Sequence, residues 1–117
     1  MRIAVVGSRT IRDYYLVEQE LKKIISQDDE IVSGGANGVD ELAEIFAKKY
    51  KIKLTIFKAE WSRYGKKAGY LRNKEIWKYC DFGIAFWDGK SKGTQHSFKL
   101  AKELNKKIII KEVQNEL

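Results

Sequence analysis

The sequence predicts an α/β fold: a single Rossmann-like domain in which a parallel five-stranded sheet has helices on both faces. Short apolar segments alternate with longer segments of helical periodicity, and glycine-rich stretches separate many of them. This alternation favours a parallel sheet, because parallel strands need crossover connections and these are right-handed. A chain of 117 residues with 44% hydrophobic content is enough for one core, so we expect residues 1–117 to form one domain.

The first half of the chain predicts two strand–loop–helix units. Residues 2–6 form a short apolar run that ends at a glycine, and residues 13–26 then carry apolar side chains at helical spacing. Residues 30–33 form a second brief strand, which two glycines end, and residues 39–47 repeat the amphipathic helical period.

The second half continues the alternation after a longer connection. Residues 51–57 alternate and contain Ile and Thr, as a third strand does. The polar and aromatic segment 58–67 predicts a long functional loop. The remaining elements are expected as helix, strand, helix and strand at 68–79, 82–87, 93–104 and 107–111.

The composition limits the classes of function. A net charge of +7 suits any anionic partner, from a nucleotide to a nucleic acid, and does not choose between them. Cys80 is the only cysteine and His96 the only histidine, which excludes an intramolecular disulfide and a Cys/His metal cluster. We therefore expect no metal, a buried Cys80 and an exposed His96.

The first apolar run is too short for a signal-peptide core or a membrane span. The expected location is therefore cytoplasmic, with no membrane partner.

Three glycine-containing loops are expected at one edge of the sheet. In a parallel sheet every strand-to-helix loop lies at the carboxyl edge, which brings the segments 7–10, 33–38 and 89–94 together. Glycine lets backbone N–H groups approach a ligand closely, and a following helix start favours phosphate. The candidate ligand-binding residues from these loops are Gly7, Ser8, Arg9, Ser33, Gly34, Gly35, Gly93 and Thr94.

The order of these glycines differs from the usual nucleotide-cofactor motifs. Gly-x-Gly-x-x-Gly does not follow the first strand, and no loop ends in the Gly-Lys-Ser/Thr of a P-loop. NAD and ATP chemistry are therefore disfavoured, and no cofactor is expected.

Charged and aromatic side chains complete the candidate site. Arg9 and Arg72 are the residues expected near phosphate, because a guanidinium donates two parallel hydrogen bonds to it. Trp61 is the preferred side chain for stacking on a base, although core packing explains it equally well. Asp40, in the first turn of the second helix, either caps that helix or binds ribose hydroxyls. Asp88, at the end of the fourth strand, is likewise expected either to cap the following helix or to bind ribose hydroxyls.

Several fragments, read in order, resemble one family. They are Gly7-Ser8-Arg9, Ser33-Gly34-Gly35-Ala36 with Gly38-Val39-Asp40, Trp61 with Tyr64-Gly65-Lys66, Ala68-Gly69-Tyr70 with Arg72-Asn73, and Asp88-Gly89 with Ser91-Lys92-Gly93-Thr94. Together they resemble the YspA/YpsA-related branch of the SLOG superfamily over nearly the whole chain. The resemblance implies a Rossmann-like fold and a nucleotide-related ligand, adds Asn73 to the candidate ligand-binding residues, and allows a homodimer.

The superfamily includes phosphoribohydrolases that release cytokinin bases, the DNA-processing protein DprA and sensor domains for nucleotide-derived signals. Arg72 matches the arginine of the phosphoribohydrolases, and Gly93-Thr94 match the Gly-Thr of their Gly-Gly-x-Gly-Thr-x-x-Glu loop. Ser97 stands where that family has its catalytic glutamate. Hydrolysis would therefore need another carboxylate, from Asp40, Asp88 or Glu60.

Three functions stay open on the sequence alone. The leading hypothesis is binding or sensing of a nucleotide-like small molecule that bears phosphate. The second is a nucleotide N-glycosidase or phosphoribohydrolase, with Arg72, Asp88 and Asp40 as the candidate catalytic residues. The third is single-strand nucleic-acid binding through the positive surface and exposed aromatic side chains.

Overall fold

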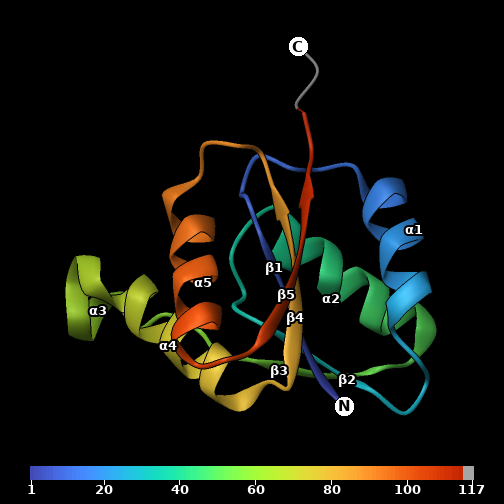
Figure 1. Cartoon of the computed structure of the whole chain (residues 1–117), viewed down its shortest axis with the longest axis horizontal. Helices are drawn as coiled ribbons and strands as arrows, with labels where there is room; N and C mark the ends of the chain where they lie inside the picture. The colour runs from blue at the N-terminus through green and yellow to red at the C-terminus, as the bar shows by residue number, and fades with distance from the viewer. Residues whose placement is uncertain (115–117) are drawn as a thin grey trace.

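The computed structural model describes residues 1–114, and its centre is a five-stranded sheet in which all neighbouring strands are parallel (Figure 1). The strands are β1 (Arg2–Gly7), β2 (Glu30–Ser33), β3 (Lys53–Ile56), β4 (Phe82–Trp87) and β5 (Lys107–Glu112). Their spatial order is β3-β2-β1-β4-β5. This arrangement confirms the predicted Rossmann-like fold class.

Helices connect the strands and cover both faces of the sheet (Figure 1). They are α1 (Tyr14–Ile24), α2 (Val39–Tyr50), α3 (Trp61–Tyr64), α4 (Ala68–Tyr79) and α5 (Lys92–Glu103), with a 3₁₀ turn η1 (Gly65–Lys67) between α3 and α4. Capping side chains define two of the starts. The Asp13 carboxylate accepts from the Leu16 N–H at 3.2 Å, and the Ser91 hydroxyl accepts from the Thr94 N–H at 3.4 Å.

Two sequence-based expectations need correction. The segment 58–67 is not a continuous loop, because α3 and η1 form within it. A single helical turn is too short to show a hydrophobic period, so the pattern gave no sign of it. The third strand begins at Lys53 rather than at residue 51, because Lys51 has φ 55° and ends α2 in the left-handed conformation.

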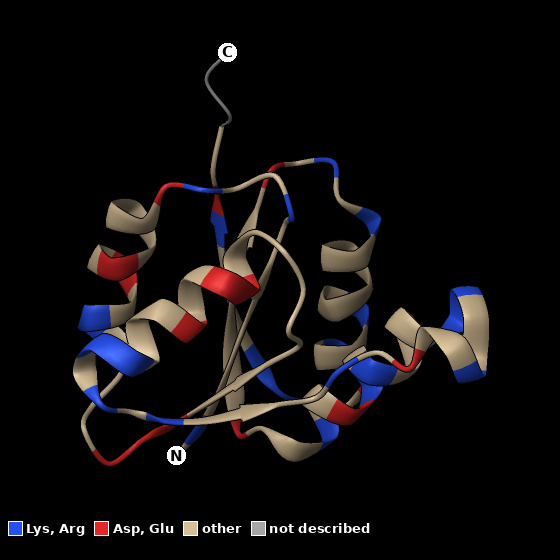
Figure 2. Ribbon diagram, turned by 180° about the vertical axis from the view of Figure 1, so that it is seen from behind, with Lys and Arg blue, Asp and Glu red and all other residues tan. Residues whose placement is uncertain are grey.

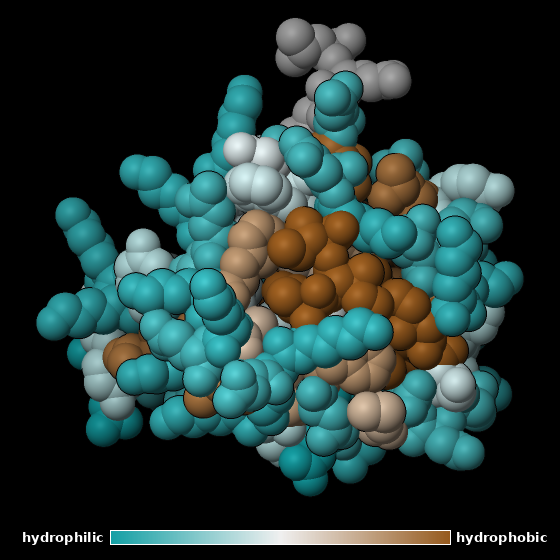
Figure 3. All heavy atoms as spheres, viewed as in Figure 1, coloured by the Kyte–Doolittle hydropathy of each residue, from teal (hydrophilic) through white to brown (hydrophobic). Residues whose placement is uncertain are grey.

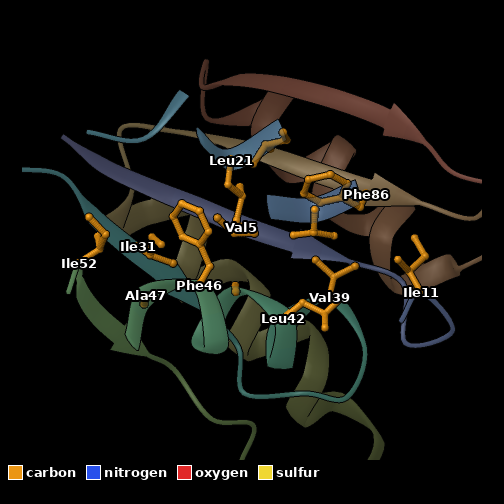
Figure 4. Close-up of a cluster of buried hydrophobic side chains, with 13 residues drawn as sticks. Val5, Ile11, Leu21, Ile31, Val39, Leu42, Phe46, Ala47, Ile52 and Phe86 are labelled. Atoms are coloured by element: carbon orange, nitrogen blue, oxygen red, sulfur yellow. The ribbon is translucent and has the colours of Figure 1, made fainter. Parts of the chain in front are cut away.

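The core consists of two apolar clusters, one on each face of the sheet. One packs Val5, Ile84 and Phe86 of the sheet against α1 and α2, and Figure 4 shows several of its side chains, with Phe46 of α2 pointing toward the strands. The other packs alternate strand residues against α4 and α5, around the fully buried Trp77. Cys80 is buried in this second cluster, as expected.

The strand order reverses between β1 and β4. From β1 the chain moves outward to β2 and β3, and it then returns to the other side of β1 for β4 and β5. The loops that follow β1 and β4 therefore diverge at their carboxyl ends and leave room for a ligand. The fold thus predicts a cleft at this point before any side chain is considered.

The edge strand β5 exposes apolar surface. β5 pairs only with β4, and Ile110 is 46% exposed. Figure 3 shows an apolar area at the centre of the face on which Figure 1 places β5, bordered by hydrophilic side chains. Within residues 1–114, no helix has the length and apolar character that crossing a membrane requires.

Candidate functional site

A cleft of about 410 Å³ lies at the carboxyl ends of β1 and β4, where the strand order reverses. We call it the switch-point cleft. Its lining residues come from the end of β1, from the connections that follow β1, β2 and β4, and from α2, α4 and α5. They are Val6, Gly7, Arg9, Thr10, Ala36, Asp40, Arg72, Asn73, Ile76, Asp88, Lys90, Ser91, Gly93, Thr94 and Ser97.

Two smaller cavities adjoin this cleft and share Arg9 and Arg72 with it. The glycine-loop cavity, of about 380 Å³, is lined by Arg9, Gly34, Gly35, Ala36, Asn37, Lys58, Ala59, Trp61 and Arg72. The aromatic cavity, of about 190 Å³, is lined by Arg9, Trp61, Lys66, Gly69, Tyr70, Arg72, Asn73 and Gly93. The shared residues make the three spaces neighbours around one pair of guanidinium groups.

Arg72 is held in place by neutral partners. Its Nη1 donates to the Gly34 carbonyl at 2.6 Å, and its Nε donates to Asn73 Oδ1 at 2.9 Å. Burial lowers the pKa of Arg72 and Asp40 opposes that effect, while the charge of Arg9 lowers the pKa further. Within residues 1–114, neither Arg72 nor Arg9 forms an ion pair. Two positive charges therefore meet at the cleft without a neutralising salt bridge.

Glycine at position 34 is what allows Arg72 to sit there. A Cβ at Gly34 would lie 2.6 Å from Arg72 Nη1. The residue in that loop that needs a positive φ is Gly35, at 69°. The Gly34 carbonyl thus holds in place one of the two arginines expected near phosphate, and the role of Gly34 itself in binding a ligand stays a prediction.

Asp40 is a buried carboxylate in the wall of the cleft. Its side chain belongs to the first turn of α2, the residue is 6% exposed, and Oδ2 accepts from the Ala36 N–H at 3.0 Å. Burial raises the pKa of Asp40 to about 6, against the effect of this hydrogen bond and of Arg72. Protonation of Asp40 therefore stabilises the folded state relative to the unfolded state. This contribution to the free energy of unfolding is fully present below pH 3.8, the ordinary pKa of the group, and is lost as the pH rises through about 6.

Asp88 has a different environment, although both carboxylates line the cleft. Its Oδ1 accepts from the N–H groups of Lys90 and Ser91, both at 2.8 Å, and its Oδ2 accepts from the Thr10 hydroxyl at 2.8 Å. Burial acts to raise the pKa of Asp88, but these hydrogen bonds lower it to about 2. Asp88 thus stays ionised and shapes the loop after β4, which makes Asp40 the better candidate for handling a proton.

Two hydroxyl-bearing candidates lie below the surface of the cleft. The Ser8 hydroxyl accepts from the Asp88 N–H at 3.0 Å and lies 3.5 Å from the Thr94 hydroxyl, so it joins the loops after β1 and β4. Ser33 is fully buried and lines neither the cleft nor the adjoining cavities. Neither residue lines the three spaces, and the contact with a ligand expected of each stays a prediction.

The other predicted residues divide between the three spaces. Those in the switch-point cleft are Gly7, Arg9, Asp40, Arg72, Asn73, Gly93 and Thr94, whereas Gly34, Gly35 and Trp61 line the adjoining cavities. Trp61 is 51% exposed, and its ring edge approaches Gly69, so it is not a core residue. Glu60 lies outside all three spaces.

His96 differs from the expectation of an exposed side chain. It is half-buried between α4 and α5, with its ring edge-on to Tyr70 at 4.7 Å between centroids. Its Nδ1 lies 3.4 Å from Asn73 Nδ2, and Asn73 in turn accepts from Arg72. Burial lowers the pKa of His96, and Lys99 adds to this effect. The neutral ring thus helps to fix the side chain that positions Arg72.

The site also contains residues that were not among the candidate ligand-binding residues. Lys90 and Ser91 line the switch-point cleft, and Lys58 and Lys66 line the adjoining cavities. Lys90 could have been identified from the sequence, because it stands inside a glycine loop. The net charge could not have identified the lysines of the site, because Lys and Arg are spread over helices, strands and loops with Asp and Glu between them (Figure 2).

Comparison with known proteins identifies the family of this chain. The model of the YspA, cpYpsA-related SLOG family matches residues 1–64, which include β1, β2 and both glycine segments of the first half. The chain belongs to this family. Gene 61 protein of Mycobacterium phage D29 is 31% identical in an alignment 117 residues long, and the alignment covers 92% of this chain and 94% of that protein. The resemblance seen in the sequence motifs is therefore confirmed.

Solved structures similar to this SLOG protein include two DNA processing proteins A. The one from Helicobacter pylori, described for its single-stranded DNA binding mode, superposes with a TM-score of 0.70 at 21% identity over 94% of this chain. The one from Streptococcus pneumoniae gives 0.75 at 18% identity over 93% of this chain. The SLOG chain spans 64% and 49% of those two chains, respectively, so the likeness concerns the fold of one part of each.

Proposed function

We propose that this SLOG protein binds a nucleotide or nucleotide-derived ligand, with a phosphate of the ligand at Arg9 and Arg72. The observation that carries the proposal is the meeting of these two guanidinium groups at the switch-point cleft without an ion pair within residues 1–114. Arginine recognises phosphate through parallel N–H donors, and it does so best in a partly desolvated site.

Three further features support an anion at this point. Lys90 adds a positive charge to the same cleft. The N-terminal ends of α2 and α5 both reach the cleft, through Asp40 and through Gly93 with Thr94, and a helix N-terminus carries a partial positive charge. A Cβ added at Gly93 would meet no atom within 4 Å, so the backbone there is open to a ligand.

Thermal-shift screening of a nucleotide library tests the proposal. A ligand at about 100 times its Kd stabilises the folded state by about 2.7 kcal/mol, which raises the Tm by several degrees. We expect such a shift with nucleoside phosphates and none with the matching nucleosides, which lack phosphate. Equal shifts with nucleosides and nucleotides would contradict the phosphate assignment, and no shift with any compound would overturn the proposal.

Chromatography of each mixture after the screen separates binding from turnover. Recovery of the intact nucleotide is the expected result. Free base plus ribose phosphate would instead indicate the N-glycosidase alternative, for which Asp40 is the carboxylate with a suitable environment.

A second candidate function is binding of single-stranded nucleic acid. Its support is the group of three neighbouring spaces that share Arg9 and Arg72, together with exposed aromatic side chains at Trp61, Tyr64 and Tyr70. Figure 1 shows α3, to which Trp61 and Tyr64 belong, projecting from the body of the molecule. The similarity to a DNA processing protein that binds single-stranded DNA is consistent with this reading.

Replacing Trp61 by alanine tests this candidate. If bases stack on Trp61, the affinity for a fluorescent oligothymidine should fall about 5- to 100-fold by anisotropy, because base–aromatic stacking contributes about 1–3 kcal/mol. The matched control is Tyr15→Ala, because Tyr15 is 69% exposed on α1 and lines none of the three spaces. Absence of binding in low salt would exclude the candidate, and equal losses in both variants would exclude a role for Trp61.

A further inference from the structure

One group in the switch-point cleft is not explained by phosphate binding. Asp40 places a buried carboxylate in the wall of a cleft that otherwise suits anions. Its Oδ2 is occupied by the Ala36 N–H, but no hydrogen bond within residues 1–114 involves Oδ1. A carboxylate accepts several hydrogen bonds, and burying one without enough donors is unfavourable. The cleft therefore offers an acceptor that a ligand can satisfy.

The charged groups around Asp40 do not supply those donors. Arg72 from α4 and Arg9 from the loop after β1 act on it through their charges, but neither forms a salt bridge with it. Arg72 directs its hydrogen bonds to Gly34 and Asn73. Glu44, one turn along α2, adds a further negative charge. A phosphate next to Asp40 would be repelled, so a different part of the ligand must face it.

The distribution of aromatic side chains indicates which part that is. Among the described residues that line the switch-point cleft there is no aromatic residue, whereas Trp61 and Tyr70 line the adjoining aromatic cavity. A base is best accommodated where it can stack. The aromatic cavity and the switch-point cleft meet along Arg9, Arg72, Asn73 and Gly93. The sugar, which joins base and phosphate, is then the donor-bearing unit within reach of Asp40.

We propose that Asp40 accepts hydrogen bonds from the 2′- and 3′-hydroxyls of a ribose, so that the ligand is a ribonucleotide rather than a deoxyribonucleotide. This inference rests on the proposed function and narrows its ligand class. Oδ1 has two lone pairs, so it can accept from both neighbouring hydroxyls while Oδ2 keeps its bond from the Ala36 N–H, and a 2′-deoxy sugar lacks one of these donors. A site built to hydrogen-bond a hydroxyl discriminates against the analogue that lacks it, because its polar group is then left without a partner.

Isothermal titration with paired ribonucleoside and 2′-deoxyribonucleoside 5′-monophosphates at pH 8 tests the inference. We expect the ribonucleotide to bind about 10-fold or more tightly than its deoxy partner, as one hydrogen bond to a charged group predicts. Asp40→Asn keeps an oxygen that can accept from the Ala36 N–H but removes the charge. It should reduce the preference to about 2-fold or less while the deoxyribonucleotide binds at least as tightly as before.

Glu41→Gln is the matched control, because Glu41 lies beside Asp40 in the first turn of α2, is exposed and does not line the cleft. It should keep the full preference, and thermal melting checks that both variants are folded. Equal binding of ribo- and deoxyribonucleotides to the unaltered protein would overturn the inference and leave the proposed function intact. A preference that survives in Asp40→Asn would also overturn it. If no nucleoside monophosphate binds at all, the proposed function itself fails.

Discussion

Replacing Arg72 by alanine is expected to weaken nucleotide binding about 10- to 100-fold, because a hydrogen bond to a charged group contributes about 1.5–3 kcal/mol. Arg72 lines the switch-point cleft and both adjoining cavities, so a phosphate held in any of them loses this contact. Arg72→Lys should recover only part of the affinity, since lysine keeps the charge but not the forked donors. Isothermal titration with a ligand found by the thermal screen gives the measurement.

The control for Arg72→Ala must remove the same charge elsewhere. Lys78→Ala does so, because Lys78 is exposed near the other end of α4 and lines none of the three spaces. A general effect of net charge would weaken binding equally in both variants. If Arg72→Ala binds as tightly as the unaltered protein, the phosphate does not sit at this guanidinium.

The second large effect concerns two glycines of the same cleft. Gly7→Ala is expected to lower the free energy of unfolding by about 2–4 kcal/mol, as overpacking against backbone does. A Cβ at Gly7 would lie 2.4 Å from the Phe86 carbonyl oxygen and 2.6 Å from Val39 Cγ2. Both neighbours belong to packed elements, β4 and α2, so neither can move away easily. Urea denaturation followed by circular dichroism measures the loss.

Gly93→Ala adds the same methyl group where it meets no atom within 4 Å. Position 93 lies in the first turn of α5, where alanine is favoured over glycine by up to about 1 kcal/mol. This variant should therefore be as stable as the unaltered protein or slightly more stable, yet bind the nucleotide more weakly, because the methyl group projects into the cleft. A loss of stability equal to that of Gly7→Ala would show that a methyl group at position 93 clashes with neighbouring atoms.

Much of the fold could be predicted from the sequence, because each parallel strand and each long helix leaves a local pattern. β4 and α4 were predicted with their observed bounds, at 82–87 and 68–79. The errors arose where the deciding feature was a single backbone conformation or a single turn. Lys51 shortens β3 through its left-handed φ, and α3 contains too few residues to show a period.

Most residues that line the candidate site could be predicted from the sequence. The hydrogen bonds that distinguish one side chain of the site from another could not. Glycine loops and arginines indicated a phosphate site, because strand-end loops converge in any such sheet. Which carboxylate is free and which is fixed depends on contacts that no local pattern encodes. Asp88 takes three hydrogen bonds from its own loop and from Thr10, whereas Asp40 takes one. Ser8 and Ser33 are likewise buried, and neither lines the cleft.

The position of Arg72 has a consequence for the size of ligand that the protein can hold. Its side chain forms a common wall of the switch-point cleft, the glycine-loop cavity and the aromatic cavity, and its link to the β2–α2 loop is the hydrogen bond to the Gly34 carbonyl. Rotation of this one side chain would break that bond and merge compartments into a single continuous groove. The same residue therefore acts as a partition between the three spaces, and its rotamer would decide how long a ligand they could hold together.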